Sequence, residues 1–324
     1  MKRYIYYILL VFVLAACERE IPYTGEYQDP KLVMEVALED GNTWIYGSVT
    51  CSDFFLDASY DKSDRWLTDV TLTVQRDGGQ KKTYTQGNSA FKMQGYSFRV
   101  QLDEPLRAGE EVRVWASHPE FPTAEGADRV VTKPSVSCEE CVWDSIRNEC
   151  RIKLKFGEDL ACDGIISVQG EFRYWKVPEG ATGYESVSRW ITSFDKCFAV
   201  LNNTYSTTYG FNSNHYDLFC RPEDVKGRVV EFVIPVDASS SYKVTKVMDA
   251  TCYVTNYSDA AYRYRQSLLD YFGFRGTDDT DLGAMFADMF GIEETVQIYN
   301  NVENGFGIVY SEAVKQFTKV FNEQ

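Results

Sequence analysis

Apolar and polar residues alternate along short segments over most of the chain, which is the pattern of β-strands with one buried face. Between residues 31 and 118 the alternation predicts about seven short strands. The clearest of them are 31–38, 44–49, 70–74, 96–102 and 112–116. Asp77-Gly78-Gly79 separates two of these segments and indicates a hairpin, because glycine adopts positive φ readily. This spacing of strands favours an immunoglobulin-like β-sandwich over residues 31–132.

Proline and glycine over residues 119–135 indicate a boundary, after which strand patterns resume at 152–156, 166–174 and 230–236. The stretch 178–227 is rich in Asn and Gly, and we expect irregular loops with short strands there. The sequence therefore predicts a mainly β fold, in which the N-terminal immunoglobulin-like β-sandwich is followed by a second β-rich domain over residues 133–324.

Two segments of the second domain carry the helical period and predict a short helical insertion. Residues 258–272 have Ser258 as a candidate N-cap and Gly273 after the expected end. Residues 281–290 carry a Met/Phe stripe, which is either core or a partner-binding face. Strands are expected again at 295–301 and 306–311.

The first residues predict export. Lys2 and Arg3 precede an apolar run over 5–13, which is too short to span a membrane as a helix. Leu14-Ala15-Ala16-Cys17 follows and resembles the lipobox of bacterial lipoproteins. The resemblance implies removal of residues 1–16, lipidation of Cys17 and membrane anchoring through its acyl chains, with 17–30 as a polar tether. The alternative is an ordinary secretory signal with a chance cysteine.

Charge and composition narrow the function classes. The chain has 33 Lys and Arg against 48 Asp and Glu, a formal net charge of −15, which argues against nucleic acid as a partner. Only 2 histidines are present, so His-based catalysis and multi-His metal sites have little to draw on. We find no catalytic or metal-binding motif, and we expect a non-catalytic protein with no cofactor, no metal and an unidentified ligand.

Eight cysteines follow Cys17, an even number that suggests disulfides in an exported protein. Their connectivity cannot be deduced from spacing, and four of them, over 138–162, would suggest a zinc site in a cytosolic protein. Cys138-x2-Cys141 could also be a redox pair, and some of the eight could be small buried hydrophobes. The eight are Cys51, Cys138, Cys141, Cys150, Cys162, Cys197, Cys220 and Cys252.

Aromatic residues gather in and near the irregular region 174–217, and loops on a β scaffold are where binding residues concentrate. The candidate binding-loop aromatics are Trp175, Tyr184, Trp190, Tyr205, Tyr209 and Tyr216. The alternative is that these side chains hold long loops in place by packing.

Residues 296–308 read as a strand, an Asn-Gly turn and a second strand, with Asn301, Gly305 and Gly307 as its characteristic positions. This segment resembles the closing motif of the outer-membrane lipoprotein family catalogued as domain of unknown function 4249, and the resemblance covers nearly the whole mature chain. It implies a lipid anchor in the outer membrane and an accessory or ligand-binding role beside a TonB-dependent transporter. It transfers no catalytic residue.

Two other functions are alternatives to this one. An anchored pilin-like or adhesin surface protein would also combine a lipobox with β-sandwiches, and a surface hydrolase would require a compact cluster of Asp, Glu or Ser in a pocket. The sequence leaves open whether the protein lies on the cell surface or on the periplasmic side.

Overall fold

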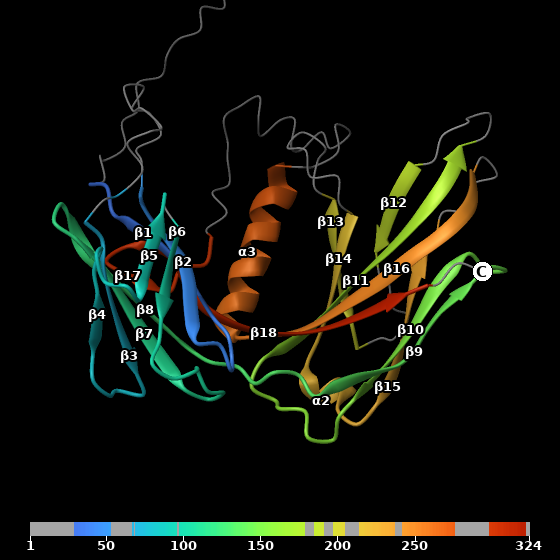
Figure 1. Ribbon diagram of the computed structural model, residues 1–324, viewed down its shortest axis with the longest axis horizontal. Helices are drawn as coiled ribbons and strands as arrows, with labels where there is room; N and C mark the ends of the chain where they lie inside the picture. Colours follow the sequence, from blue (N-terminus) through green and yellow to red (C-terminus); the bar gives the residue numbers. More distant parts are fainter. Residues whose placement is uncertain are drawn as a thin grey trace, which may run out of the picture.

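The computed structural model shows a mainly β protein with three sheets, the largest of which runs through the whole molecule (Figure 1). The structure describes residues 29–52, 67, 69–95, 97–178, 185–190, 197–204, 214–236, 242–275 and 298–321. The signal segment, Cys17 and most of the tether, together with the helix expected at 281–290, lie outside these residues. The mainly β fold class is confirmed.

Eight strands precede residue 132: β1 (Leu32–Leu38), β2 (Trp44–Cys51), β3 (Thr71–Arg76), β4 (Lys82–Tyr84), β5 (Phe91–Gln94), β6 (Ser97–Gln101), β7 (Glu111–His118) and β8 (Phe121–Arg129). The next strands are β9 (Val136–Asp144), β10 (Glu149–Phe156), β11 (Ile165–Pro178), β12 (Glu185–Trp190), β13 (Ala199–Thr204), β14 (Asn214–Cys220), β15 (Val229–Pro235) and β16 (Tyr242–Tyr257). The chain ends in β17 (Val302–Glu303) and β18 (Phe306–Val320), and the described helices are α2 (Pro222–Val225) and α3 (Asp259–Arg275).

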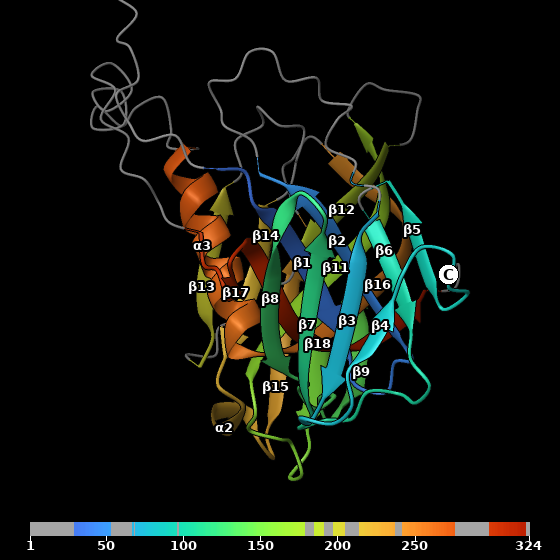
Figure 2. The same cartoon turned by 90° about the vertical axis from the view of Figure 1, so that its left-hand side faces the viewer.

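The first sandwich follows the pattern expected from the sequence, with seven strands between residues 32 and 118. A five-stranded sheet in the order β17-β8-β7-β3-β4 packs against the β18-β1-β2-β6-β5 part of the large sheet (Figure 2). Alternate residues of β1, namely Leu32, Met34, Val36 and Leu38, are fully buried between the sheets. The hairpin at Asp77-Gly78-Gly79 is confirmed, because Asp77 and Gly78 have φ of 45° and 67° and join β3 to β4.

The second sandwich uses the other half of the large sheet. Its β13-β14-β11-β16-β18 part, with β12 on β11, packs against the three-stranded sheet β15-β10-β9. The shared core contains many large side chains, among them Phe172, Phe232 and Phe156. Trp143 of β9 stacks on Phe172 of β11 with ring centroids 5.2 Å apart, so aromatic packing joins the two layers.

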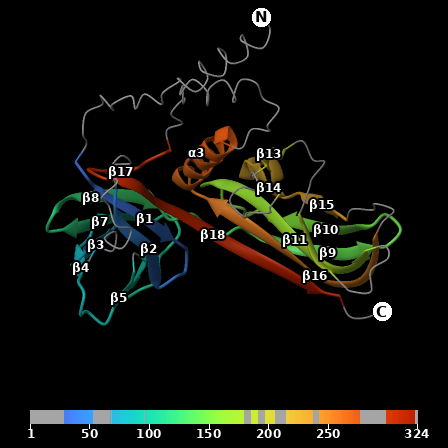
Figure 3. The same ribbon diagram turned by 90° about the horizontal axis from the view of Figure 1, so that it is seen from above.

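One strand, β18, belongs to both sandwiches (Figure 3). Its first half pairs in parallel with β1, from Phe306 opposite Val33, and its second half pairs antiparallel with β16, ending at Val320 opposite Asp249. Val309 enters the first core and Phe317 the second. Because these positions differ by an even number of residues, both cores lie on the same side of β18.

The end of the chain is placed differently from the sequence-based division at residue 132. Val302 and Val309 pack in the first core, so residues 302–311 complete the N-terminal sandwich, although they come last in the sequence. The strand expected at 295–301 is absent over the described residues 298–301, and β17 begins at Val302. Asn300 explains the difference, because its side chain accepts a hydrogen bond from the Val302 N–H (3.0 Å) and makes a turn there.

The helix expected at 258–272 is confirmed as α3, which lies on the face of the large sheet opposite the two cores (Figure 3). Ser258 is its N-cap, since its Oγ accepts a hydrogen bond from the Ala261 N–H at 3.1 Å. The helix continues past Gly273 to Arg275, three residues beyond the expected end at residue 272. Ala261 and Tyr262 pack with Phe219, Tyr257 and Tyr310 of the sheet.

Candidate functional site

The closing motif joins the two sheets of the first sandwich through the side chain of Asn301. Its Nδ2 donates to the Val309 carbonyl (2.7 Å) and to the Ala127 carbonyl (3.3 Å), and its Oδ1 accepts from the Val309 N–H (2.9 Å). The amide therefore acts as a short piece of strand between β8 and β18. Since Val309 is fully buried, Asn301 satisfies two backbone groups that water cannot reach.

The two glycines of the motif allow the return of the chain against β1. A Cβ at Gly305 would lie 2.7 Å from the Leu32 carbonyl oxygen and 2.9 Å from the Ala124 Cβ. Gly307 has φ of +110°, and a Cβ there would overlap the Met34 carbonyl. The turn residue Asn304 also has positive φ, at 56°. Asn301, Gly305 and Gly307 are thus structural residues that close the first sandwich.

A buried hydroxyl hub lies where the two sandwiches and α3 meet. The Ser311 Oγ donates to the Leu38 carbonyl (3.1 Å) and accepts from the Val131 N–H (3.0 Å). The Ser311 N–H donates to Asp128 Oδ2 (2.8 Å), and the N–H of Ser258, the cap of α3, donates to the Ser311 carbonyl (2.9 Å). Ser311 therefore holds β1, the residues after β8 and the start of α3 in one place.

Ionisable side chains gather on the face of β1 and β18 that α3 covers. Glu35 lies in β1, and Glu39 is the residue that follows this strand. Both share this face with Tyr310 and Glu312 of β18, as the pairing register requires. Burial raises the pKa of Glu312, and the nearby Glu39 and Glu35 raise it further, while Arg265 lowers it. Burial also raises the pKa of Glu35 and of Tyr310.

Two residues of α3 complete this acidic face, which we define as Glu35, Tyr264, Arg265, Tyr310 and Glu312. Burial and the neighbouring Glu35 raise the pKa of Tyr264. The Arg265 guanidinium lies over the Tyr257 ring, 5.6 Å from its centroid. A region that disfavours ionised carboxylates would gain most from a cationic or hydrogen-bond-donating group placed beside them.

Glu312 makes the stability of the fold depend on pH. Because its folded-state pKa is raised above the ordinary value, the proton stabilises the folded state below about pH 4.5, and this contribution is lost as pH rises through the folded pKa. We expect the melting temperature of the wild type to fall relative to that of Glu312→Gln between about pH 4 and pH 7.

Thermal melts of both proteins across this pH range test the prediction, and Glu125→Gln is the matched control. Arg113 lowers the pKa of Glu125, so its contribution is present above the ordinary carboxyl pKa and lost as pH falls. Over most of this pH range Glu125→Gln should therefore run parallel to the wild type, and a shift of the opposite sign should appear only below about pH 4.5. Parallel melting curves for the wild type and Glu312→Gln would contradict the prediction.

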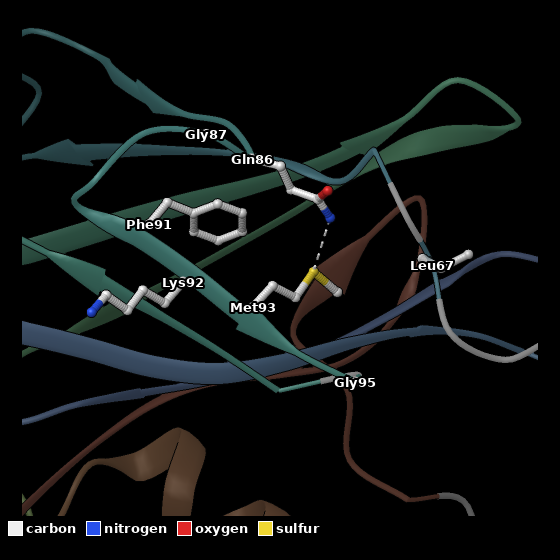
Figure 4. A pocket seen from close by; sticks show the side chains of 7 residues that line it. All are labelled: Leu67, Gln86, Gly87, Phe91, Lys92, Met93 and Gly95. Atoms are coloured by element: carbon white, nitrogen blue, oxygen red, sulfur yellow. Dashed lines mark hydrogen bonds between the residues drawn. The ribbon is translucent and has the colours of Figure 1, made fainter.

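An open pocket of about 550 Å³ lies at the edge of the first sandwich, beside β5. Its lining is Leu67, Gln86, Gly87, Phe91, Lys92, Met93 and Gly95 (Figure 4). Gln86 Nε2 lies 3.9 Å from the Met93 sulfur, whereas Lys92 extends away from this pair (Figure 4). The lining provides apolar surface and one amide, without a set of polar groups that converge on a common point.

Of the aromatic residues predicted to bind ligand, only Trp175 has a described side chain. It is half-buried on β11, opposite Ser186 of β12. Trp190 lies on β12 and Tyr216 on β14, where only the backbone is described, and Tyr184, Tyr205 and Tyr209 lie outside the described residues. The structure thus brings the strands carrying Trp175, Trp190 and Tyr216 together, because β12 and β14 both pair with β11.

Seven of the eight cysteines lie in or against the two cores, and the structure shows no disulfide within the described part of the chain. Cys162 is exposed and Cys51 packs on the first core. The other six lie in or against the second core: Cys138, Cys141, Cys150, Cys197, Cys220 and Cys252. They pack there as small apolar side chains, which is the alternative that the sequence left open.

The described residues contain no group of three or more His, Cys, Asp or Glu arranged to hold a metal ion. His118 accepts a hydrogen bond at Nδ1 from the Glu120 N–H (3.2 Å), and its ring lies 5.2 Å from that of Phe121. Among the described helices, none has the length and apolarity of a membrane-spanning segment.

Sequence reasoning did not find the acidic face or the Ser311 hub. The alternation over 306–312 marks Tyr310 and Glu312 as one face of a strand, but the sequence does not show that α3 covers that face. Likewise, the sequence does not show that Ser311 makes hydrogen bonds to residues of β1, β8 and the start of α3.

The chain is thus a mainly β protein whose last described strand is shared by two sandwiches. The chain belongs to the family described as Domain of unknown function (DUF4249), whose model matches residues 18–318. Comparison with curated proteins gave no match. Among solved structures, a marsupial T cell receptor is similar at 10% identity, covering 71% of this chain and 84% of that chain. Its TM-score of 0.20 does not establish a shared fold.

Proposed function

We propose that the protein is a non-catalytic, lipid-anchored outer-membrane protein that acts as an accessory or ligand-binding partner of a TonB-dependent transporter. The proposed lipid anchor is supported by the N-terminal sequence. Lys2 and Arg3 precede the apolar run 5–13, and Leu14-Ala15-Ala16-Cys17 follows it. Several acyl chains on Cys17 would anchor the chain stably, since each buried methylene contributes about 0.8 kcal/mol.

The proposed partnership with a transporter rests on what the resemblance to the family implies. The acidic face supports this proposal as a candidate binding surface. The acidic face combines two carboxylates, two tyrosines and an arginine, and its raised carboxyl pKa values favour contact with a cationic group. A partner presenting Lys or Arg side chains fits this chemistry. The same argument supports a second possibility, a basic ligand bound directly by the protein.

Fatty-acid labelling in the native cell tests the anchor. With an alkyne fatty acid, we expect the wild type to be labelled and to sediment with the outer membrane, and Cys17→Ser to lose the label and leave that fraction. Cys162→Ser, which alters an exposed cysteine far along the chain, is the matched control and should keep both properties. Label retained in Cys17→Ser would overturn lipidation at this residue.

A pull-down from native membranes in mild detergent tests the partner. We expect a stoichiometric TonB-dependent transporter in the eluate, and its loss in Glu35→Lys together with Glu312→Lys, because these changes reverse the charge of the acidic face. Lys92→Glu, at the pocket beside β5, is the control and should retain the partner. Recovery of the protein alone, or as a ladder of itself, would count against the transporter and favour the pilin-like alternative.

A further inference from the structure

Two cysteines on neighbouring strands meet inside the second sandwich. Cys141 of β9 lies opposite Ile152, and Cys150 of β10 lies opposite Trp143, so the two cysteines are diagonal neighbours in the antiparallel pair. Cys150 is fully buried and Cys141 packs against the same core. Both side chains therefore lie on the core-facing side of the sheet, one diagonal step apart.

Cys138 reaches the same place because the strand is irregular. A spacing of three residues would put Cys138 and Cys141 on opposite faces of a regular strand. The register shift between Lys153 and Leu154 inserts an extra residue in β9, so both cysteines pack on the core. Cys252 of β16 approaches from the facing sheet and is buried there.

The four thiols differ in their tendency to ionise. The hydrogen bond from Cys150 and the positive charge of Lys319 lower the pKa of Cys141. Burial raises the pKa of Cys138 and of Cys252, and the Cys141 hydrogen bond raises that of Cys150. Since the thiolate is the nucleophile in disulfide exchange, Cys141, which is also partly accessible, is the thiol that reacts first.

We propose that Cys141 and Cys150 form a disulfide when the protein meets a disulfide oxidant such as glutathione disulfide. The Cys141 thiolate attacks one sulfur of glutathione disulfide, whose S–S bond breaks and releases a glutathione thiolate. Cys150 then attacks the Cys141 sulfur in the mixed disulfide, releasing the second glutathione, and the two leaving thiolates take up the two cysteine protons. One protein disulfide is formed and one glutathione disulfide is reduced to two thiols.

This pairing matters in the cell only if the proposed export places the chain in an oxidising compartment. The thiol–disulfide exchange itself can be tested on the purified protein. The new bond would staple β9 to β10 on the side of the core where Trp143 stacks on Phe172. Cys138 and Cys252 would remain as thiols beside it.

The experiment uses the purified, reduced chain in a glutathione disulfide titration, followed by N-ethylmaleimide blocking, proteolysis and mass spectrometry. We expect a cross-linked peptide pair containing Cys141 and Cys150, and a melting temperature about 5 °C higher than that of the reduced protein. Cys162→Ser should keep the cross-link. In Cys150→Ser the reaction should end at the mixed disulfide between Cys141 and glutathione.

Maleimide on both Cys141 and Cys150 after oxidation, or a cross-link from Cys141 to Cys138 or Cys252 instead, would overturn the proposal. The wild-type mapping decides the question even if Cys150→Ser fails to fold. The disulfide mapping does not depend on fatty-acid labelling at Cys17. Failure of the proposed lipid anchor and failure of the proposed disulfide are therefore distinguishable.

Discussion

Replacing Gly307 by alanine is expected to lower the free energy of unfolding by about 3–5 kcal/mol, from backbone strain and overpacking together. Gly307 has φ of +110°, which a residue with a Cβ adopts only with strain, and its Cβ would overlap the Met34 carbonyl of β1. The backbone on both sides is held by the pairing of β1 with β18, so the clash cannot be relieved locally. Urea denaturation of the wild type and the variant measures the loss.

Gly109→Ala is the matched control for this substitution. Gly109 also has positive φ, at +84°, but a Cβ there would have no heavy atom within 4 Å. The free energy of unfolding of Gly109→Ala should therefore fall by only about 1–2 kcal/mol, from the strain of the backbone conformation. If the two alanine variants are equally stable, close packing of β18 against β1 is not what requires glycine at residue 307.

Replacing Asn301 by aspartate is expected to cost about 2–4 kcal/mol, although the two side chains have nearly the same shape. The Asp oxygen can still accept from the Val309 N–H. The oxygen that replaces Nδ2, however, would face the carbonyls of Val309 and Ala127, which it repels. The Val309 carbonyl is then left buried without its donor. Thermal or urea unfolding of the purified variant measures the effect.

The control for Asn301 is Asn88→Ala, which removes an exposed asparagine whose Oδ1 accepts from the Ala90 N–H. We expect a loss of less than about 1 kcal/mol, because water replaces that hydrogen bond. A small effect at Asn301 as well would mean that its amide does not carry the junction of β8 and β18.

The closing motif illustrates how far sequence reasoning reaches. The Asn-Gly turn at 304–305 and the strand after it were predictable, because turn residues act through their own backbone preferences. Membership of the family was also recognised from these residues. The partner strand was not predictable, since nothing in the alternation of 306–311 indicates pairing with β1, more than 270 residues earlier in the chain.

The cysteines show the same limit in another form. Their number predicted disulfides, and the structure shows six of the thiols packed in or against the second core, with Cys141 and Cys150 as diagonal neighbours on adjacent strands. The spacing of Cys138 and Cys141 suggests opposite faces of a strand, and only the bulge in β9 places both on the core. Local sequence does not encode that irregularity.

By itself, the sequence determined the mainly β character, the hairpin at 77–79, the α3 helix with Ser258 as its N-cap and the family to which the chain belongs. These features depend on periodicity and turn chemistry, which act over a few residues. Only the tertiary structure decided that β18 is shared by two cores, that Ser311 joins three elements and that α3 covers an acidic face. Each of these depends on contacts between residues far apart in the chain, whose free energy exists only after the elements have packed together.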